Sequence, residues 1–241
     1  MNKKKLDILA VGVHPDDIEL GCSGTLLKHI ALGKTCGVLD LTKGELGSRG
    51  SVELREIEAK KSAKVLGLDC RISLDLEDGY FENNFDSQKK IIEVLRMYKP
   101  ELVLANAVSD RHPDHGRAAK LVADACFYSG LSKIETTYNG IKQESWRPKA
   151  VYHYIQDHTL KPDFVVDVSP YSDKKQEAIM CFSSQFYNPN SNEPQTPISS
   201  PEFLESVFSK MSIFGRAIGV RYAEGFTVNR YIGVNNLFDL I

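Results

Sequence analysis

The chain has 241 residues, of which 42% are hydrophobic and 26% are charged, and this apolar content is enough to bury one substantial core. No shift in composition divides the chain, so we expect a single domain over residues 1–241. The 30 basic and 32 acidic side chains give a net charge of −2. This balance argues against a nucleic-acid partner, which would require a basic surface.

Hydrophobic stretches and cysteines bear on the compartment. No apolar stretch reaches the length of a membrane span, and the run Leu6–Val13 is interrupted by Asp7, so we expect neither a membrane segment nor a conventional signal peptide. The 5 cysteines are far apart and include no Cys-x-x-Cys pair. They are typical of reduced, mostly buried residues in a cytoplasmic protein.

Apolar runs alternate with helical patterns along the chain. The runs that predict strands are Leu6–Val13, Cys36–Leu41, Arg71–Leu76, Glu101–Ala107, Ala150–Ile155 and Phe164–Val168. The patterns that predict helices are Gly24–Leu32, Glu53–Leu66, Ser87–Tyr98, Gly116–Tyr128, Lys174–Phe182 and Glu202–Ile218. This alternation predicts an α/β, Rossmann-like fold, with a mostly parallel sheet and helices on both of its faces.

Two histidine-aspartate clusters follow the first and fourth predicted strands. They are His14-Pro15-Asp16-Asp17 and His112-Pro113-Asp114-His115. In an open parallel sheet, ligands bind at the carboxyl ends of the strands near the point where the strand order reverses, so we expect the clusters to meet there. Imidazole and carboxylate suit zinc or iron(II), and three protein ligands leave a position for water. The sequence therefore predicts a site for metal-assisted hydrolysis at this edge.

Each cluster alone has a simpler interpretation. Pro15 suits the first turn of a helix, and Asp16 could cap the free amide groups of that helix. The second cluster strengthens the metal interpretation, because His112 and His115 are three residues apart and would face one side of a turn. The other histidines fit ordinary helix or strand patterns and are left out of the site: His29, His153 and His158.

Two further segments limit the function. Gly44–Gly50 lacks the Gly-x-Gly-x-x-Gly spacing and follows the second strand, which argues against a dinucleotide cofactor. Tyr187–Ser200 is rich in Asn, Pro and Ser and predicts a surface loop, with a lid or a subunit-contact arm as alternatives. The oligomeric state stays open, a homo-oligomer included.

The two clusters resemble those of the zinc-dependent sugar N-deacetylases, a family that includes enzymes of the glycosylphosphatidylinositol, mycothiol and bacillithiol pathways. The resemblance runs almost end to end. It is also carried by Gly44–Gly50, Glu53–Glu56, Asp78-Gly79, Asp110–His112, Ser184–Phe186 and Tyr222–Phe226. The last two blocks look most like the bacillithiol branch, which removes acetate from N-acetylglucosaminyl malate. Many family members have a glutamate directly after the two aspartates, whereas here Ile18 precedes Glu19, so no role is assigned to Glu19.

Carried over by position, the resemblance implies the metal ligands, and the chemistry of the remaining cluster residues suggests their roles. His14, Asp17 and His115 become the ligands of zinc, with iron(II) as the alternative metal. Asp16 becomes the general base that takes a proton from water. His112, in its protonated form, becomes the donor that hydrogen-bonds the oxyanion. Asp114 would orient an imidazole or cap a helix.

The resemblance also implies a small sugar conjugate as the substrate. Arg55 and Asp78 would hold ring hydroxyls, although a helix salt bridge and a turn are simpler explanations for these two residues. The carboxylates of malate would need cationic partners, for which the candidates are Lys43, Arg49, Arg111 and Arg221. N-acetylglucosaminyl malate is the first expectation, and a chitobiose-like or other N-acetylglucosamine conjugate is the second.

A non-catalytic metal-binding or sugar-binding protein is the alternative from another class. Such a protein would use the same ligands without turnover. Asp16 distinguishes the two, because a site that only binds has no need of a general base beside the metal.

Overall fold

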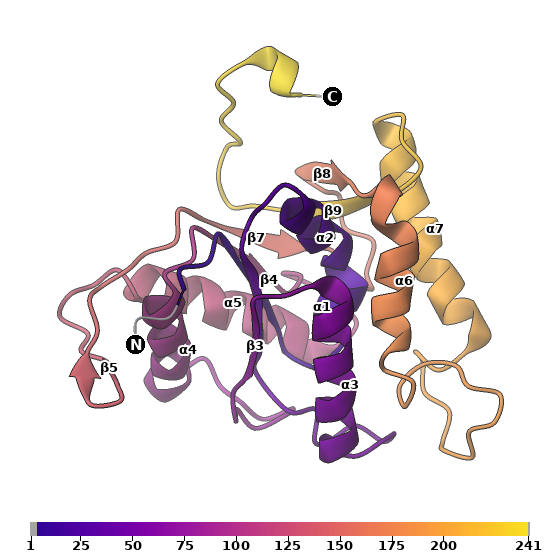
Figure 1. Ribbon diagram of the computed structural model, residues 1–241, viewed down its shortest axis with the longest axis horizontal. Helices are drawn as coiled ribbons and strands as arrows, with labels where there is room; N and C mark the ends of the chain where they lie inside the picture. The colour runs from indigo at the N-terminus through magenta and orange to yellow at the C-terminus, as the bar shows by residue number, and fades with distance from the viewer. Residues whose placement is uncertain (1–3, 241) are drawn as a thin grey trace.

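The computed structural model of the chain describes residues 4–240. Its centre is a seven-stranded sheet with the order β3-β2-β1-β4-β7-β9-β8 (Figure 1). The strands of this sheet are β1 (Ile8–Gly12), β2 (Cys36–Asp40), β3 (Cys70–Ser73), β4 (Leu102–Ala105), β7 (Ala150–Tyr154), β8 (Phe164–Asp167) and β9 (Ala223–Thr227). A separate small hairpin consists of β5 (Thr137–Tyr138) and β6 (Ile141–Lys142). The strands from β3 to β7 pair in parallel, and β9 pairs antiparallel with β7 and β8, so the predicted mostly parallel sheet is confirmed.

Helices cover both faces of this sheet, as predicted. They are α1 (Asp17–Gly21), α2 (Ser23–Ala31), α3 (Val52–Leu66), α4 (Phe85–Tyr98), α5 (Pro113–Tyr128), α6 (Ser172–Met180) and α7 (Pro201–Ala217), with the 3₁₀ turns η1 (Ser169–Tyr171) and η2 (Leu237–Asp239). In Figure 1, α4 and α5 lie on one side of the sheet, and α1, α3 and α6 lie on the other. None of these helices, within residues 4–240, is long and apolar enough to cross a membrane.

Strand β1 is buried on both faces, which is why its sequence is a continuous apolar run rather than an alternating one. Leu9 and Val11 pack into the core beneath α4 and α5, whereas Ile8 and Ala10 pack into the core on the opposite face. The same strand pairs in parallel with β2 and with β4. The strand order reverses between β1 and β4, so the residues that follow these two strands meet at one edge, as the sequence predicted.

Several elements were not predicted from the sequence, among them α1 and β9, besides the β5–β6 hairpin and the two 3₁₀ turns. The helix α1 starts at Asp17, the last residue of the first cluster, and it is only five residues long. The strand β9 contains Glu224 and Gly225, which interrupt its apolar pattern. Both elements depend on contacts with distant parts of the chain, and such contacts leave no local periodicity to read.

One buried ion pair, Lys175–Glu224, joins the end of α1 to the start of α2. The Nζ of Lys175 lies 2.7 Å from Oε1 of Glu224, and both side chains are buried. Lys175 donates hydrogen bonds to the last carbonyls of α1, while Glu224 accepts hydrogen bonds from the first amides of α2. The partners are Glu19 O, Leu20 O, Gly24 N and Thr25 N. The pair therefore satisfies backbone groups that two adjoining helix ends would otherwise leave unpaired.

Replacing Lys175 by methionine would leave the Glu224 carboxylate buried without its cation. We expect Lys175→Met to lower the free energy of unfolding by about 3–5 kcal/mol, measured by urea denaturation. The control is Lys60→Met, which removes an exposed pair with Glu56 and should leave the free energy of unfolding nearly unchanged. Combining Lys175→Met with Glu224→Leu should recover most of the loss. A single Lys175→Met variant as stable as the parent chain would contradict the structural role of this pair.

Candidate metal and catalytic site

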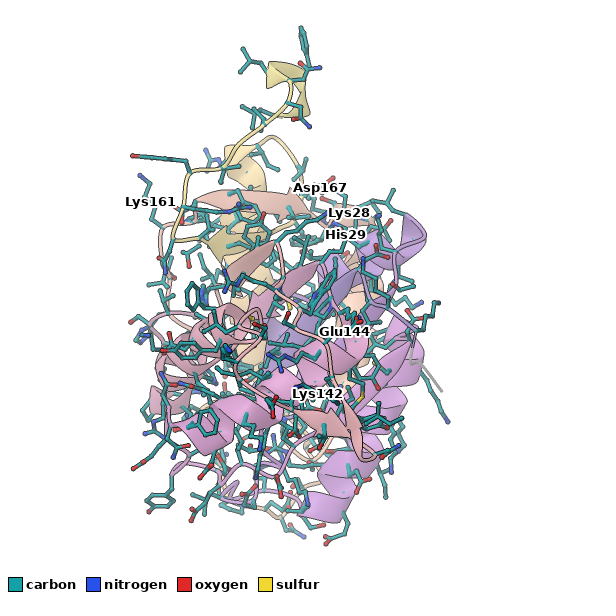
Figure 2. The ribbon with its side chains drawn as sticks, turned by 90° about the vertical axis from the view of Figure 1, so that its left-hand side faces the viewer. Lys28, His29, Lys142, Glu144, Lys161 and Asp167 are labelled. Carbon is teal, nitrogen blue, oxygen red and sulfur yellow. The ribbon has the colours of Figure 1, made fainter. Side chains whose placement is uncertain are left out.

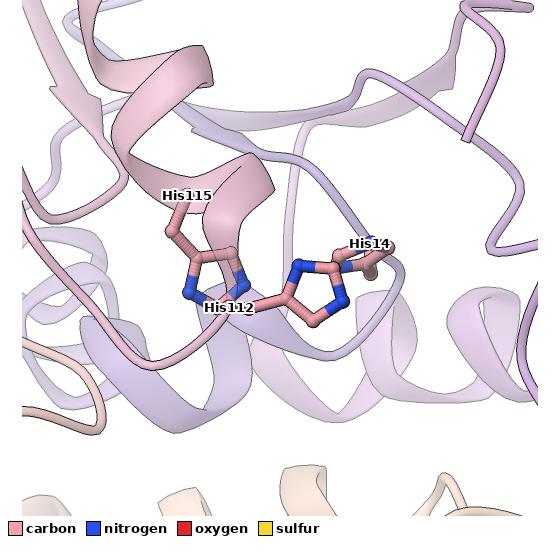
Figure 3. A group of neighbouring side chains, drawn as sticks. All are labelled: His14, His112 and His115. Carbon is pink, nitrogen blue, oxygen red and sulfur yellow. The ribbon is translucent and has the colours of Figure 1, made fainter. Parts of the chain in front are cut away.

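Three imidazoles converge at the carboxyl ends of β1 and β4. His14 follows β1, and His112 and His115 lie at the start of α5 (Figure 3). The ring centroid of His14 is 4.7 Å from that of His112 and 5.7 Å from that of His115. One nitrogen from each ring lies within 4.8 Å of the other two. The two clusters therefore meet in space.

The carboxylate of Asp17 lies between the two outer histidines. Its Oδ1 is 3.2 Å from Nε2 of His115, and its Oδ2 is 3.7 Å from Nδ1 of His14. Atoms bound at about 2.0–2.2 Å to a tetrahedral metal are about 3.3–3.6 Å apart, and these two distances lie just outside that range. The described residues whose ligand atoms come together in groups able to hold a metal are His14 with His112 and His115, and His14 with Asp78 and Asp114. The ring of His112 is also close enough to offer a nitrogen. The side chains of the four candidate residues therefore lie next to one another: His14, Asp17, His112 and His115.

Asp17 is held by amide groups from three strand ends. Its Oδ2 accepts hydrogen bonds from the backbone amides of Val13 and His14 and from Nδ2 of Asn106. Its Oδ1 accepts one from Nε2 of Gln156. Oδ1 therefore keeps more capacity for a metal than Oδ2. Asn106 and Gln156 were missed in the sequence, because a single amide residue after a strand carries no distinctive pattern.

Two further carboxylates orient the histidine rings. Oδ2 of Asp110 lies 2.6 Å from Nδ1 of His115, and Oδ1 of Asp78 lies 3.0 Å from Nε2 of His14. A proton on each of these outer nitrogens leaves the other nitrogen of the ring with a lone pair toward Asp17. Asp78, which we expected to hold a sugar hydroxyl, also accepts a hydrogen bond from the amide of Leu46 with its other oxygen. In this structure Asp78 supports His14.

These carboxylates change the acidity of both rings. Burial alone would lower the pKa of His14, but the adjacent Asp17 and Asp78 outweigh burial and raise this pKa to about 10. Burial likewise opposes the charge on His115, yet Asp17 and Asp110 raise the pKa of His115 to about 9. Without a metal, both rings are therefore cationic at pH 7, and a metal must displace their protons.

Asp16 occupies the N-cap position of α1, but its side chain makes no capping hydrogen bond. The simpler interpretation of this residue as a helix cap is therefore not supported. Its backbone has φ 137°, a region that non-glycine residues adopt at a cost of about 1–3 kcal/mol. Burial raises the pKa of Asp16 to about 7, against the opposing charge of Arg55. A carboxyl group with this pKa can exchange a proton near neutral pH.

His112 lies at the N-cap of α5, where its Nδ1 accepts a weak hydrogen bond of 3.4 Å from the amide of Asp114. Burial lowers the pKa of His112, and the neighbouring His14 and His115 lower it further. The ring is thus neutral near pH 7, in contrast to the protonated form that we expected. A neutral ring whose Nδ1 accepts a hydrogen bond carries its proton on Nε2, and this N–H can still donate.

The carboxylate of Asp114 makes no hydrogen bond to an imidazole among the described residues. Its carboxylate accepts hydrogen bonds from the amide of Gly79 and from Arg117, and its nearest approach to a ring nitrogen is 3.8 Å, at His14. Asp114 therefore joins the start of α5 to the turn that carries Asp78.

Arg55 reaches the same centre from α3. Its guanidinium donates hydrogen bonds to the carbonyls of Gly44 and Pro15, and lies 3.4 Å from Oδ2 of Asp16. Its buried Nε has no hydrogen-bond partner among the described residues. Gly44 has φ 66°, and a Cβ there would lie 1.9 Å from the Arg55 guanidinium. A side chain at Gly44 would therefore be strained by the backbone conformation and would press on the Arg55 guanidinium.

A pocket of about 450 Å³ opens over these residues. Its floor is the histidine-aspartate centre, and its far wall comes from α7 and from the segment Tyr187–Ser200. The wall residues are Thr196, Pro197, Ile198, Phe203, Ser206, Val207 and Lys210. The predicted surface loop therefore also shapes the pocket.

The cationic candidates for malate are placed differently. Arg49 and Arg111 line the pocket, and Lys43 and Arg221 do not. Arg49 donates hydrogen bonds to the carbonyls of Ser184 and Pro194, and so holds the loop. Arg111 pairs with Asp157. Lys210, which the sequence did not single out, donates to the carbonyls of Gln156 and Asp157.

The block Tyr222–Phe226, which favoured malate in the sequence, does not line the pocket. It is mostly strand β9, and its Glu224 is buried against Lys175 and α2. This part of the resemblance reflects a packing requirement and says nothing about the substrate.

Metal binding should release protons. With pKa values of about 10 and 9 for His14 and His115, zinc added to metal-free protein at pH 7 should release about two protons. Calorimetric titration in two buffers of different ionisation enthalpy measures this number. Asp110→Asn removes one carboxylate that raises the pKa of His115, so the release should fall toward one. Zinc binding without proton release would contradict the charge state derived for the two rings.

Comparisons with known proteins agree with this geometry. Residues 9–126 match the family PIG-L, described as GlcNAc-PI de-N-acetylase. A diacetylchitobiose deacetylase from Thermococcus kodakarensis is 29% identical over 231 residues, covering 90% of this chain and 81% of that protein. A probable N-acetyl-alpha-D-glucosaminyl L-malate deacetylase from Bacillus anthracis is 26% identical, covering 76% of this chain and 83% of that protein. The malate branch is thus not distinguished as the nearer one.

A solved structure has a similar fold over nearly the whole chain. A conserved protein from Thermus thermophilus superposes with a TM-score of 0.84 and 35% identity, covering 95% of this chain and 98% of that chain. The part of the chain that matches the family, residues 9–126, includes both clusters and nearly all of the chain from β1 to the end of α5. Residues 9–126, almost half of the chain, are therefore similar to the PIG-L family.

Proposed function

We propose that the protein is a metal-dependent N-deacetylase that releases acetate from an N-acetylglucosamine conjugate. One observation carries this proposal: Asp16 is buried beside the metal-binding centre, makes no capping hydrogen bond, and has a pKa near 7. A site that only binds a metal or a sugar needs no such group. The relatives of known name that match the chain include deacetylases of N-acetylated sugars.

His14, Asp17 and His115 are the residues proposed to hold the metal, and the zinc or iron(II) would polarise the acetamide carbonyl and acidify a water. Asp16 would accept a proton from the attacking water as the water oxygen adds to the carbonyl carbon. Arg55, 3.4 Å from Asp16, favours the ionised carboxylate before this transfer. The N–H of His112 donates a hydrogen bond to the carbonyl oxygen as negative charge develops on it.

Collapse of the tetrahedral intermediate requires a proton on the nitrogen of the sugar. Asp16, now a carboxylic acid, can return the proton it has just taken, and His112 is the second possible donor. The C–N bond then breaks, which releases the amine and acetate. The chain therefore supplies one group that carries the proton through both steps.

The sugar ring would lie between this centre and the far wall of the pocket. Arg55 is proposed to contact a ring hydroxyl, since it lines the pocket and its buried Nε has no partner among the described residues. Asp78 also lines the pocket, and we propose that it accepts a hydroxyl proton while keeping its contact with His14.

The group linked to the sugar is proposed to be uncharged, for example a second sugar ring. Each cation on the pocket wall already contacts a carboxylate or backbone carbonyls. The diacetylchitobiose deacetylase also matches more of this chain than the malate enzyme does. Malate stays the second candidate because the side chain of Arg111 is 43% exposed at the pocket and could exchange Asp157 for a carboxylate of the substrate.

Substitution of Asp16 tests the chemistry. Asp16→Asn should lower the kcat for acetate release by about 10²–10⁴ while metal content stays at the parent level, because Asp16 lies outside the proposed ligand set. His115→Ala should instead lower metal content. A matched control, Asp75→Asn, changes an exposed aspartate that pairs with Lys90 and should change neither quantity. If Asp16→Asn emptied the site of metal, the base and ligand assignments would have to be exchanged.

A substrate panel tests the aglycone. Acetate release should be measured on diacetylchitobiose, N-acetylglucosaminyl malate and free N-acetylglucosamine, with the parent chain and with Arg111→Ala. We expect the highest kcat/KM for diacetylchitobiose, and a change of only about twofold in that value on substituting Arg111, since one unneeded cation contributes little. A preference for the malate conjugate that Arg111→Ala abolishes would assign malate instead and leave the deacetylase chemistry intact.

A further inference from the structure

Lys210 lines the pocket but has no part in the proposed proton transfers. It lies on α7, in the far wall of the pocket. Its ammonium donates hydrogen bonds to the backbone carbonyls of Gln156 and Asp157. Within residues 4–240 it forms no ion pair with a carboxylate. An ammonium has three N–H groups, so one N–H of Lys210 is left without a partner in the described part of the chain.

The two carbonyls that Lys210 contacts belong to a loop that is fixed from its other side. This loop follows β7 at the carboxyl ends of the parallel strands. The carboxylate of Asp110 accepts hydrogen bonds from two consecutive amides of the loop, and the side chain of Gln156 donates to Asp17. Because both carbonyls are held in place, they direct two N–H groups of the tetrahedral ammonium. The direction of the third N–H is thereby set before any ligand binds.

The partly buried position of Lys210 makes an unused N–H costly. Burial lowers the pKa of Lys210, and the nearby carboxylates of Asp157 and Asp110 oppose this effect without reaching the ammonium. A cation withdrawn from water is stabilised when each of its N–H groups has an acceptor. A molecule bound in the pocket can supply the acceptor that the chain does not.

The place of Lys210 in the pocket indicates which part of a sugar conjugate would meet it. Arg55 and Asp78, proposed for the ring hydroxyls, come from α3 and from the turn that follows β3. Lys210 comes from α7, on the far wall. A ring whose acetamide lies at the metal and whose hydroxyls meet Arg55 and Asp78 therefore turns its linked group toward the far wall.

We propose that Lys210 donates its third N–H to a neutral oxygen of the group linked to the N-acetylglucosamine, such as an oxygen of a second sugar ring. The inference rests on the proposed function and names a residue that favours the conjugate over the free sugar. A neutral acceptor suits this corner of the pocket, because the cations Lys210 and Arg111 already lie beside the carboxylates of Asp157 and Asp110. A free monosaccharide lacks this remote contact and its binding energy.

A purely structural role for Lys210 leads to a different expectation. Through the loop after β7, Lys210 is connected to Asp17 and to Asp110, which orients His115. If Lys210 only held this loop, its removal would disturb the metal site and lower kcat on every substrate alike. A contact with the linked group, away from the reacting atoms, instead raises KM for the conjugate and leaves kcat nearly unchanged.

Acetate release by the metal-loaded full chain separates these two roles. Lys210→Met keeps the aliphatic stem and removes the ammonium. We expect kcat/KM for diacetylchitobiose to fall by roughly 10- to 100-fold, mainly through KM, which is the usual effect of losing a hydrogen bond to a charged group. The value for free N-acetylglucosamine and the metal content should stay nearly unchanged. Lys210→Arg retains a cation and should recover part of the loss.

The matched control is Lys142→Met on the β5–β6 hairpin. Figure 2 labels Lys142, whose side chain is 66% exposed, pairs with Glu135 and does not line the pocket over the histidines. This change should alter neither kcat/KM value. Calorimetry in an Asp16→Asn background, which slows turnover, gives a second readout. There, Lys210→Met should weaken the binding of diacetylchitobiose and leave that of free N-acetylglucosamine unchanged.

Three results would overturn the proposal. The first is an equal loss of kcat on both substrates, which would show that Lys210 only holds the loop. The second is diacetylchitobiose binding that is absent in the Asp16→Asn chain or is unaffected by Lys210→Met. The third is a loss confined to N-acetylglucosaminyl malate, which would make the acceptor a carboxylate. If the parent chain releases no acetate yet binds diacetylchitobiose through Lys210, the proposed function fails and the contact stands.

Discussion

The buried carboxylate of Asp17 is the constraint on which the centre of this protein depends. A charge removed from water must be surrounded by donors, and here the donors come from the ends of three strands. Val13 and His14 follow β1, Asn106 follows β4, and Gln156 follows β7. One carboxylate thus fixes the relative positions of loops that are far apart in sequence. His14, His112 and His115 are positioned by the loops that follow β1 and β4.

The sequence predicted the parts of this arrangement that have a local signature. The alternating apolar runs, such as that of β1, were sufficient to predict the parallel sheet. The paired clusters were sufficient to predict that His14 and His115 lie close together. Single residues such as Gln156 and Lys210 were not predictable, because an isolated polar residue after a strand or on a helix has many ordinary explanations. The strand β9 was missed for a related reason. Its Glu224 can be buried because it pairs with Lys175, which lies 49 positions away in sequence.

The blocks that matched the bacillithiol branch show a limit of reading substrate from local similarity. Tyr222–Phe226 is mostly a strand whose glutamate accepts hydrogen bonds from helix amides. In Ser184–Phe186, the side chains of Ser184 and Gln185 donate hydrogen bonds to Glu58 and to the carbonyl of Arg49. Their side chains are occupied in holding the fold together, so related proteins with different substrates can share them. Residues with unsatisfied polar atoms or exposed charges on the pocket wall, such as Arg55 and Arg111, are better guides to specificity.

The positive φ of Asp16 affects which substitutions this position can accept during evolution. Glycine adopts that backbone conformation without strain, so Asp16→Gly would be favoured by any selection that acts on folding alone. The same change would delete the buried carboxylate beside the histidines. With Asp16 as the proposed base, stability and activity favour different residues at this one position, and a copy of the chain that no longer needs the activity would be expected to acquire glycine there.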